Sequence, residues 1–257
     1  MSNYQAADLL QSSVELLNEG AALIESGNLR EASGVLKSAL LISKRCIAEG
    51  REQVEDDDYS ASSSNDACDV GIDQFMSIST GKGDEPDEWS IHTSASSFYN
   101  RPIKITNFPP APSIQGDFFT MVCSVTVFNL ALACHLDAVT NTTICQEEKQ
   151  SRMSQAMRLY ESIFKLQDGS LHQANAFFLM ACLNNLGNIH QDLGNTDRAM
   201  ACFGQLLSIL MFLIEQRSIC DDQEPSSVCH YEEYFACFFP SISPLIFPNA
   251  TKVARAA

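Results

Sequence analysis

The chain has 257 residues and a mass of 28.3 kDa, and its 32 acidic residues against 16 basic ones give a net charge of −16. An apolar fraction of 45% allows a sizeable core, which disfavours a collagen-like, coiled-coil or wholly disordered chain. The charge balance argues against nucleic acid and against anionic membrane surfaces, since both require a basic face.

Residues 1–50 are expected to form a first helical hairpin. Apolar residues recur at helical spacing on both sides of Gly27 and Asn28. These two residues interrupt the pattern as a glycine C-cap followed by a turn does. The opening residues lack the basic start of a secretory signal peptide, so we expect an intracellular protein, cytoplasmic or nuclear.

Residues 51–116 do not follow the helical period and are expected to form an acidic insertion. Thirteen acidic residues between Glu49 and Glu88 are opposed only by Arg51 and Lys82. This stretch is either an acidic interaction or phosphorylation segment, with Ser63 as acceptor, or an inserted loop without a role.

Two short alternating stretches within the insertion could pair as a small β-ribbon. They are Met76-Ser77-Ile78-Ser79 and Ile103-Lys104-Ile105-Thr106. An isolated ribbon is marginal, so this one would have to pack on the helices.

Residues 117–217 predict two further helical hairpins, one on each side of residue 170. A polar loop over 141–150 links the helices of the second hairpin, and Gly194-Asn195 turns the third. The uncharged run Phe118–Cys134 could also be a short membrane span, but a buried helix explains it better. Residues 218–257 contain the apolar run Tyr234–Phe239, which we expect to cap the end of the hairpins.

The third hairpin carries the most specific pattern. Leu183, Leu186, Gly187, Ala199 and Phe203 follow one another at spacings of 3, 1, 12 and 4. This resembles the tetratricopeptide repeat, in which a small residue on each helix allows close crossing. The first two hairpins repeat the frame less closely, at Leu16, Gly20, Ala32 and Leu36, and at Leu130, Ala131, Ala156 and Tyr160.

The resemblance implies a mainly α fold, a short solenoid of three stacked helical hairpins with the acidic insertion after the first. It also implies a concave groove that binds a peptide or a partner helix. Asparagines recur at one position of the frame, and amides there could bind a peptide backbone or tie neighbouring helices together. The candidate peptide-binding residues are Asn18, Asn129, Asn184, Asn185, Asn188 and Gln191. No Lys or Arg lies beside them, which argues against peptides gripped by their terminal carboxylate.

No common catalytic or nucleotide-binding motif occurs in the chain. The densest Cys and His group, from Cys220 to Cys237, matches no compact zinc spacing, so we expect neither metal nor cofactor. The ten cysteines are expected to be reduced thiols. We therefore predict a non-enzymatic platform for a protein or peptide partner. An enzyme using His135, His190 or a thiol, and a membrane-associated protein, are the alternatives; the sequence leaves the oligomeric state open.

Overall fold

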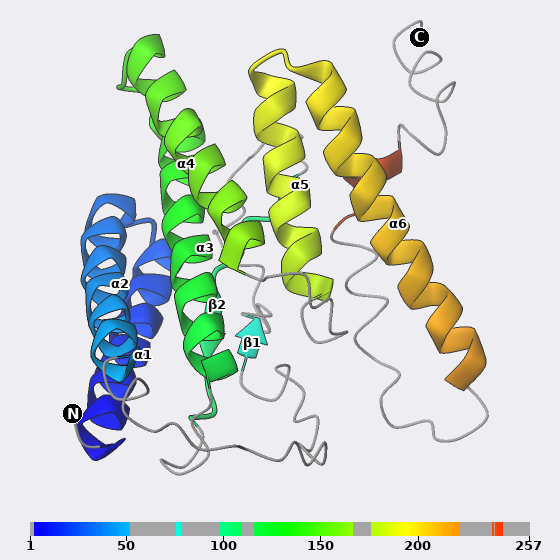
Figure 1. Cartoon of the computed structure of the whole chain (residues 1–257). Coiled ribbons are helices and arrows are strands. Elements are labelled where there is room, and N and C mark those ends of the chain that lie inside the picture. Colours follow the sequence, from blue (N-terminus) through cyan, green and yellow to red (C-terminus); the bar gives the residue numbers. More distant parts are fainter. Residues whose placement is uncertain are drawn as a thin grey trace, which may run out of the picture. The chain divides into compact units, whose positions relative to one another are not determined.

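The computed structural model describes residues 3–51, 76–78, 98–108, 116–166, 176–220, 238 and 240–243. The chain is mainly α and forms three helical hairpins, as the sequence predicts (Figure 1). In chain order the elements are α1 (Asn3–Glu25), α2 (Leu29–Arg51), β1 (Met76–Ile78), β2 (Ile103–Ile105), α3 (Gly116–Thr140), α4 (Gln146–Leu166), α5 (Ala176–Asp192) and α6 (Thr196–Cys220).

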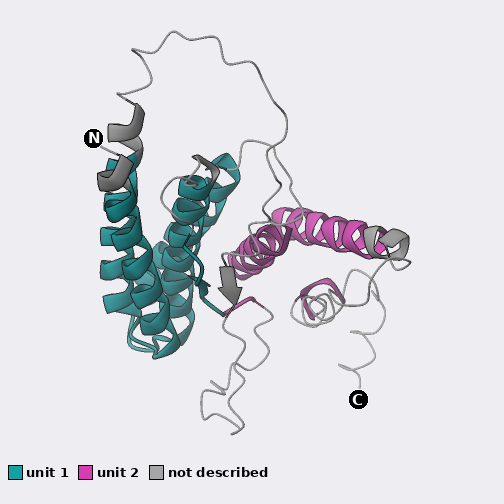
Figure 2. Cartoon of the chain, turned by 90° about the horizontal axis from the view of Figure 1, so that it is seen from below, with its two compact units in different colours: residues 1–80, 101–170 teal, residues 81–100, 171–257 magenta. Residues whose placement is uncertain are grey.

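The chain divides into two compact units (Figure 2). Unit 1 consists of residues 1–80 and 101–170, and it contains the first two hairpins and both strands. Unit 2 consists of residues 81–100 and 171–257, and it contains the third hairpin. This division separates the two hairpins that the sequence places together in 117–217, and the boundaries expected from the sequence stay a prediction.

The first and third hairpins turn in the same way. Gly27 and Gly194 adopt φ values of 78° and 77°, which only glycine adopts without strain. In each turn the glycine and the following asparagine donate their N–H groups back to carbonyls of the last helical turn, at 2.8–3.0 Å. These two hydrogen bonds form a Schellman motif, which satisfies carbonyl groups that would otherwise be unpaired at the end of the helix.

The same two hairpins also share one packing device. A Cβ on Gly20 would lie 2.6 Å from Leu36 Cγ, and a Cβ on Gly187 would lie 2.5 Å from the ring of Phe203. Ala32 and Ala199, four residues before these two large side chains, are buried. The close helix crossing that the resemblance implies is therefore present in both hairpins.

The second hairpin keeps the frame but packs it differently. Ala131 and Ala156 are fully buried, and Tyr160 stacks edge-on against Phe128 with 5.7 Å between ring centroids. The connecting loop is shorter than expected, because α4 begins at Gln146 rather than after residue 150. Acidic residues in the first turn of α4 favour this early start, since they interact well with the positive end of the helix dipole.

Unit 1 is built around α3. Helix α2 packs on both α1 and α3, and α4 covers another side of α3. Within the stretch Phe118–Thr140, 89% of the residues in an 18-residue apolar window are buried. The uncharged run that raised the membrane question is thus a core helix among the described residues of unit 1.

Strands β1 and β2 pair antiparallel, with Met76 opposite Ile105 and Ile78 opposite Ile103. Strand β2 also packs on α1 and α3, and both of its isoleucines are buried. The ribbon is therefore supported by helices, which an isolated pair of three-residue strands would need.

Three expectations fall largely outside the described residues. They concern the acidic run, the Ser63 acceptor and most of the tail Tyr234–Phe239. Phe238 is described and is fully buried in unit 2, where its ring lies against Phe177 and Tyr99.

Candidate functional site: asparagines that hold an extended backbone

In unit 1, two of the aligned asparagines hold strand β2. Asn129 Oδ1 accepts a hydrogen bond from the Ile103 N–H at 3.0 Å, and Asn129 Nδ2 donates to the Ile103 carbonyl at 2.7 Å. Asn18 makes the same pair with Ile105, at 2.9 and 2.8 Å. Each amide therefore occupies the donor and the acceptor of one residue, as a neighbouring strand would.

In unit 2, Asn185 does the same for a different residue. Its Oδ1 accepts from the Tyr99 N–H at 2.7 Å, and its Nδ2 donates to the Tyr99 carbonyl at 2.9 Å. The Tyr99 ring meets Phe177 edge-on at 5.4 Å and lies 6.0 Å from Phe238. The third asparagine thus has the same chemistry, with an aromatic side chain at the residue that it holds.

The segment that these asparagines hold belongs to the chain itself. The bonds join residues 26, 86 and 87 positions apart, so they are long-range contacts rather than local turns. Ile103 and Ile105 are two residues apart, which places both side chains on the same face of an extended strand. Both are at most 2% exposed, while Lys104 between them pairs with Glu25 at 2.7 Å.

The remaining candidate residues lie on α5 but make other contacts. Asn184 is fully buried, and Asn188 Nδ2 donates to the Asn184 carbonyl at 2.8 Å, within the helix. Gln191 is exposed near the end of α5. Their proposed role toward a peptide stays a prediction, as it does for the three aligned asparagines.

The groups named for the enzyme alternative are buried. His135 and His190 are 1% and 3% exposed, and burial lowers the pKa of His135 to about 3. Burial also raises the pKa of the Cys123, Cys134 and Cys182 thiols, which keeps them protonated. Within the described part of the chain, no three His, Cys, Asp or Glu side chains gather as a metal site would require.

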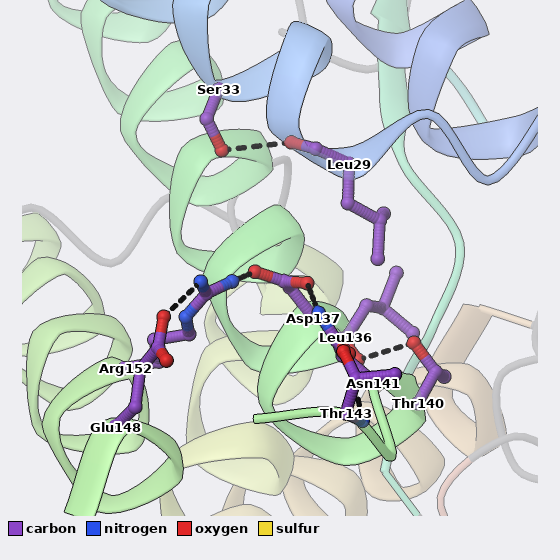
Figure 3. A network of polar contacts seen from close by, with 9 residues as sticks. All are labelled: Leu29, Ser33, Leu136, Asp137, Thr140, Asn141, Thr143, Glu148 and Arg152. Atoms are coloured by element: carbon purple, nitrogen blue, oxygen red, sulfur yellow. Dashed lines mark hydrogen bonds and ion pairs between the residues drawn. The ribbon is translucent and has the colours of Figure 1, made fainter. Parts of the chain in front are cut away.

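A polar network in unit 1 joins α3 to α4. Arg152 forms ion pairs with Asp137 and with Glu148, the latter at 2.6 Å (Figure 3). Asn141 donates its amide to Asp137 at 3.2 Å. Next to this network lies an open cavity of about 610 Å³, which the Gly27 turn and the end of α3 border. The network fixes the α3–α4 connection.

Sequence reasoning found the asparagines and missed what they hold. Their position in the frame was visible because it repeats in three hairpins. The alternation of Ile103, Lys104 and Ile105 was visible too, as a strand. No pattern joined the two, since neither an amide nor a short strand specifies its partner.

A tetratricopeptide repeat family model matches residues 179–210, which cover most of α5, the Gly194 turn and the first part of α6. No curated protein and no solved structure matches the chain. Repeats of this family generally mediate protein interactions and are typically not catalytic. The matched segment contains Asn185, Gly187 and the Gly194 turn, whose contacts recur in the first hairpin. The chain is therefore a tetratricopeptide-repeat-like helical repeat protein.

Proposed function

We propose that this protein is a non-enzymatic interaction platform, which holds an extended peptide of a partner protein on the first helices of its hairpins. The observation that carries the proposal is the amide pairing of Asn129 with the Ile103 backbone. Such pairing forms hydrogen bonds with the N–H and C=O groups of a backbone and does not depend on the side chain. It therefore suits a peptide of variable sequence.

The same chemistry selects an extended peptide over a partner helix. Inside an α-helix the backbone N–H and C=O groups are already bonded to each other, so they are closed to an outside amide. An extended strand leaves both groups of every second residue pointing to one side. Asn18 and Asn129, which take residues two positions apart, match that repeat.

The test begins with a full-length variant in which Ile103, Lys104 and Ile105 are replaced by Gly-Ser-Gly, here called the cleared chain. A display library of random peptides is selected on it, and the affinities of the enriched peptides are measured. Asn129→Ala in the cleared chain should weaken them roughly tenfold, because two backbone groups of the peptide lose their partners.

The matched control is Asn141→Ala, which removes an amide at the end of α3 whose bond goes to Asp137. It should leave the enriched peptides bound with unchanged affinity. If the Asn129→Ala chain binds the peptides with equal affinity, the asparagines are not the peptide-binding site. If a folded cleared chain enriches no peptide, the proposal of an interaction platform is wrong.

A further inference from the structure

We infer that Ile103-Lys104-Ile105 is a built-in ligand of unit 1, and that a partner segment with the pattern aliphatic–basic–aliphatic binds by taking its place. This inference rests on the proposed function. It adds which peptide the platform accepts and how its access is controlled.

The backbone of β2 is bound as a ligand strand would be. Asn129 and Asn18 hold both polar groups of Ile103 and of Ile105, at 2.7–3.0 Å. These four bonds come from side chains, so any extended residue could form them in the same place. The bonds alone give affinity without choice of sequence.

The side chains of β2 show which peptide sequences the site would accept. Ile103 and Ile105 are buried against α1 and α3, so the positions that they fill would reject a charged or polar residue. Both are β-branched, as a buried strand position prefers. An incoming segment should therefore carry aliphatic residues two positions apart.

The position between them favours a basic residue. Lys104 Nζ lies 2.7 Å from Glu25 Oε2, and both side chains are about 30% exposed. Because both side chains are partly shielded from solvent, salt screens this ion pair less than a pair on the open surface. Thr106, which follows the strand, is exposed and places no demand on the sequence.

The covalent tether makes β2 a strong competitor. Only ten residues separate Ile105 from Gly116, the first residue of α3. A ligand tethered by so short a linker acts at an effective concentration on the order of millimolar. A free segment with the same contacts therefore binds the intact chain more weakly than it binds a chain whose own strand is disabled.

The test measures binding of a blocked, fluorescent peptide with the sequence of residues 100–108. We expect it to bind the cleared chain, and to bind the intact chain roughly tenfold or more weakly because of the tethered competitor. In the peptide, Ile103→Asp or Ile105→Asp should abolish binding, and Lys104→Glu should weaken it. Thr106→Ala is the matched control and should bind like the parent peptide.

Two results would overturn the inference: equal affinity for the intact and the cleared chain, or equal binding by the Ile103→Asp peptide. If the cleared chain binds library peptides through Asn129 that lack the alternating pattern, this inference falls and the proposed function stands. If the folded cleared chain binds neither the library peptides nor the probe, both fall.

A second measurement covers a cleared chain that fails to fold. The intact chain is mixed with excess heavy-isotope peptide, and hydrogen exchange is followed at its own Ile103 and Ile105 amides. Displacement should speed exchange at both amides, whereas unchanged exchange at saturating peptide would contradict the inference. The milder double variant Ile103→Ser/Ile105→Ser, with its backbone intact, should bind the probe more tightly than the unmodified chain does.

Discussion

Helices α3 and α6 have the same length and similar apolar character, yet they differ in how much of them is covered. Both are long and apolar enough to cross a membrane by length and composition. In α3, 89% of the apolar window is buried, and in α6 only 33%. Helix α3 has neighbours in α2, α4 and β2, whereas α6 packs on α5. Apolarity therefore predicts a helix but not the number of sides on which it is covered.

The exposed side of α6 carries large apolar residues, namely Met200, Met211, Phe212 and Ile214. Its inner side carries Phe203 and Leu206, which are buried. Such a one-sided helix at the end of a repeat is expected where a further repeat or cap would otherwise pack. Five predictions test the difference in burial between α3 and α6.

The largest effect should come from a matched pair of phenylalanines. Phe128→Ala in α3 removes a fully buried ring that packs on Tyr160, and should lower the free energy of unfolding by about 3–5 kcal/mol. Phe212→Ala in α6 removes a ring that is 51% exposed and should cost less than about 1 kcal/mol. Urea unfolding of both variants checks this, and similar losses would show that α6 is covered in solution.

The next largest loss of stability should come from removing the buried hydrogen bonds between α3 and the backbone of β2. Asn129→Ala leaves the Ile103 N–H and carbonyl without their partners and should cost about 2–4 kcal/mol. Thr126→Val is the control, because its hydroxyl bonds within α3 to the Val122 carbonyl. Hydrogen exchange at the Ile103 amide should speed up in the first variant only. Equal protection in both would mean that the asparagine does not hold the strand.

A pH effect should also arise from α3. The pKa of His135 is about 3 in the folded chain and near 6.5 when unfolded. Only the unfolded state gains a proton on this residue as the pH falls below 6.5, so stability is fully present above that value and is lost toward pH 3. Between pH 7 and pH 5 the loss from this residue should be about 2 kcal/mol.

His135→Leu removes the titrating group while keeping an apolar side chain in its place. Urea unfolding at both pH values should show a smaller loss in this variant than in the unmodified chain. An identical loss in the two proteins would place the pH dependence elsewhere.

Two glycines allow the inner and outer sides of α6 to be compared: Gly187 on α5 faces the inner side of α6, and Gly204 lies on α6 itself. Gly187→Ala would push a Cβ against the Phe203 ring and should cost about 1–3 kcal/mol. Gly204→Ala meets nothing within 4 Å and should stabilise α6 by about 0.5–1 kcal/mol. Thermal unfolding of the two variants should therefore shift in opposite directions, and a destabilised Gly204→Ala chain would reveal an unseen neighbour.

The smallest effect on stability should come from the exposed side of α6. The double variant Met211→Lys/Ile214→Lys places charges at residues that are 48% and 43% exposed, so the free energy of unfolding should change by less than about 0.5 kcal/mol. Light scattering should show equal or lower self-association, since an apolar patch is removed. A loss of several kcal/mol would mean that this side is packed.

Much of the fold was accessible from the sequence because its signals are local. Apolar spacing located the hairpins, and Gly27 and Gly194 located the turns, where a positive φ demands glycine. The close approach of the helices at Gly187 followed from a repeat pattern that encodes a helix crossing, and the structure adds that the Phe203 ring lies against this glycine. Strand β2 was visible as an alternation of three residues.

The site was accessible only in part, because its decisive contacts span long distances in the chain. Asn18 lies 87 residues before the strand residue that it holds. The low burial of α6 was hidden for a related reason. Its composition is close to that of α3, and composition does not report how many neighbours a helix meets.

The buried thiols described above give this protein its own reporters of opening. Cys123 and Cys134 lie in unit 1 and Cys182 in unit 2, and burial raises the pKa of all three. Each would react with an alkylating reagent only when its surroundings open, whereas the exposed Cys145 would react at once. Timed alkylation followed by peptide mass spectrometry would thus give separate opening rates for the two units without any engineered label. Equal opening rates would indicate that the two units open cooperatively, and unequal rates would show which unit opens first.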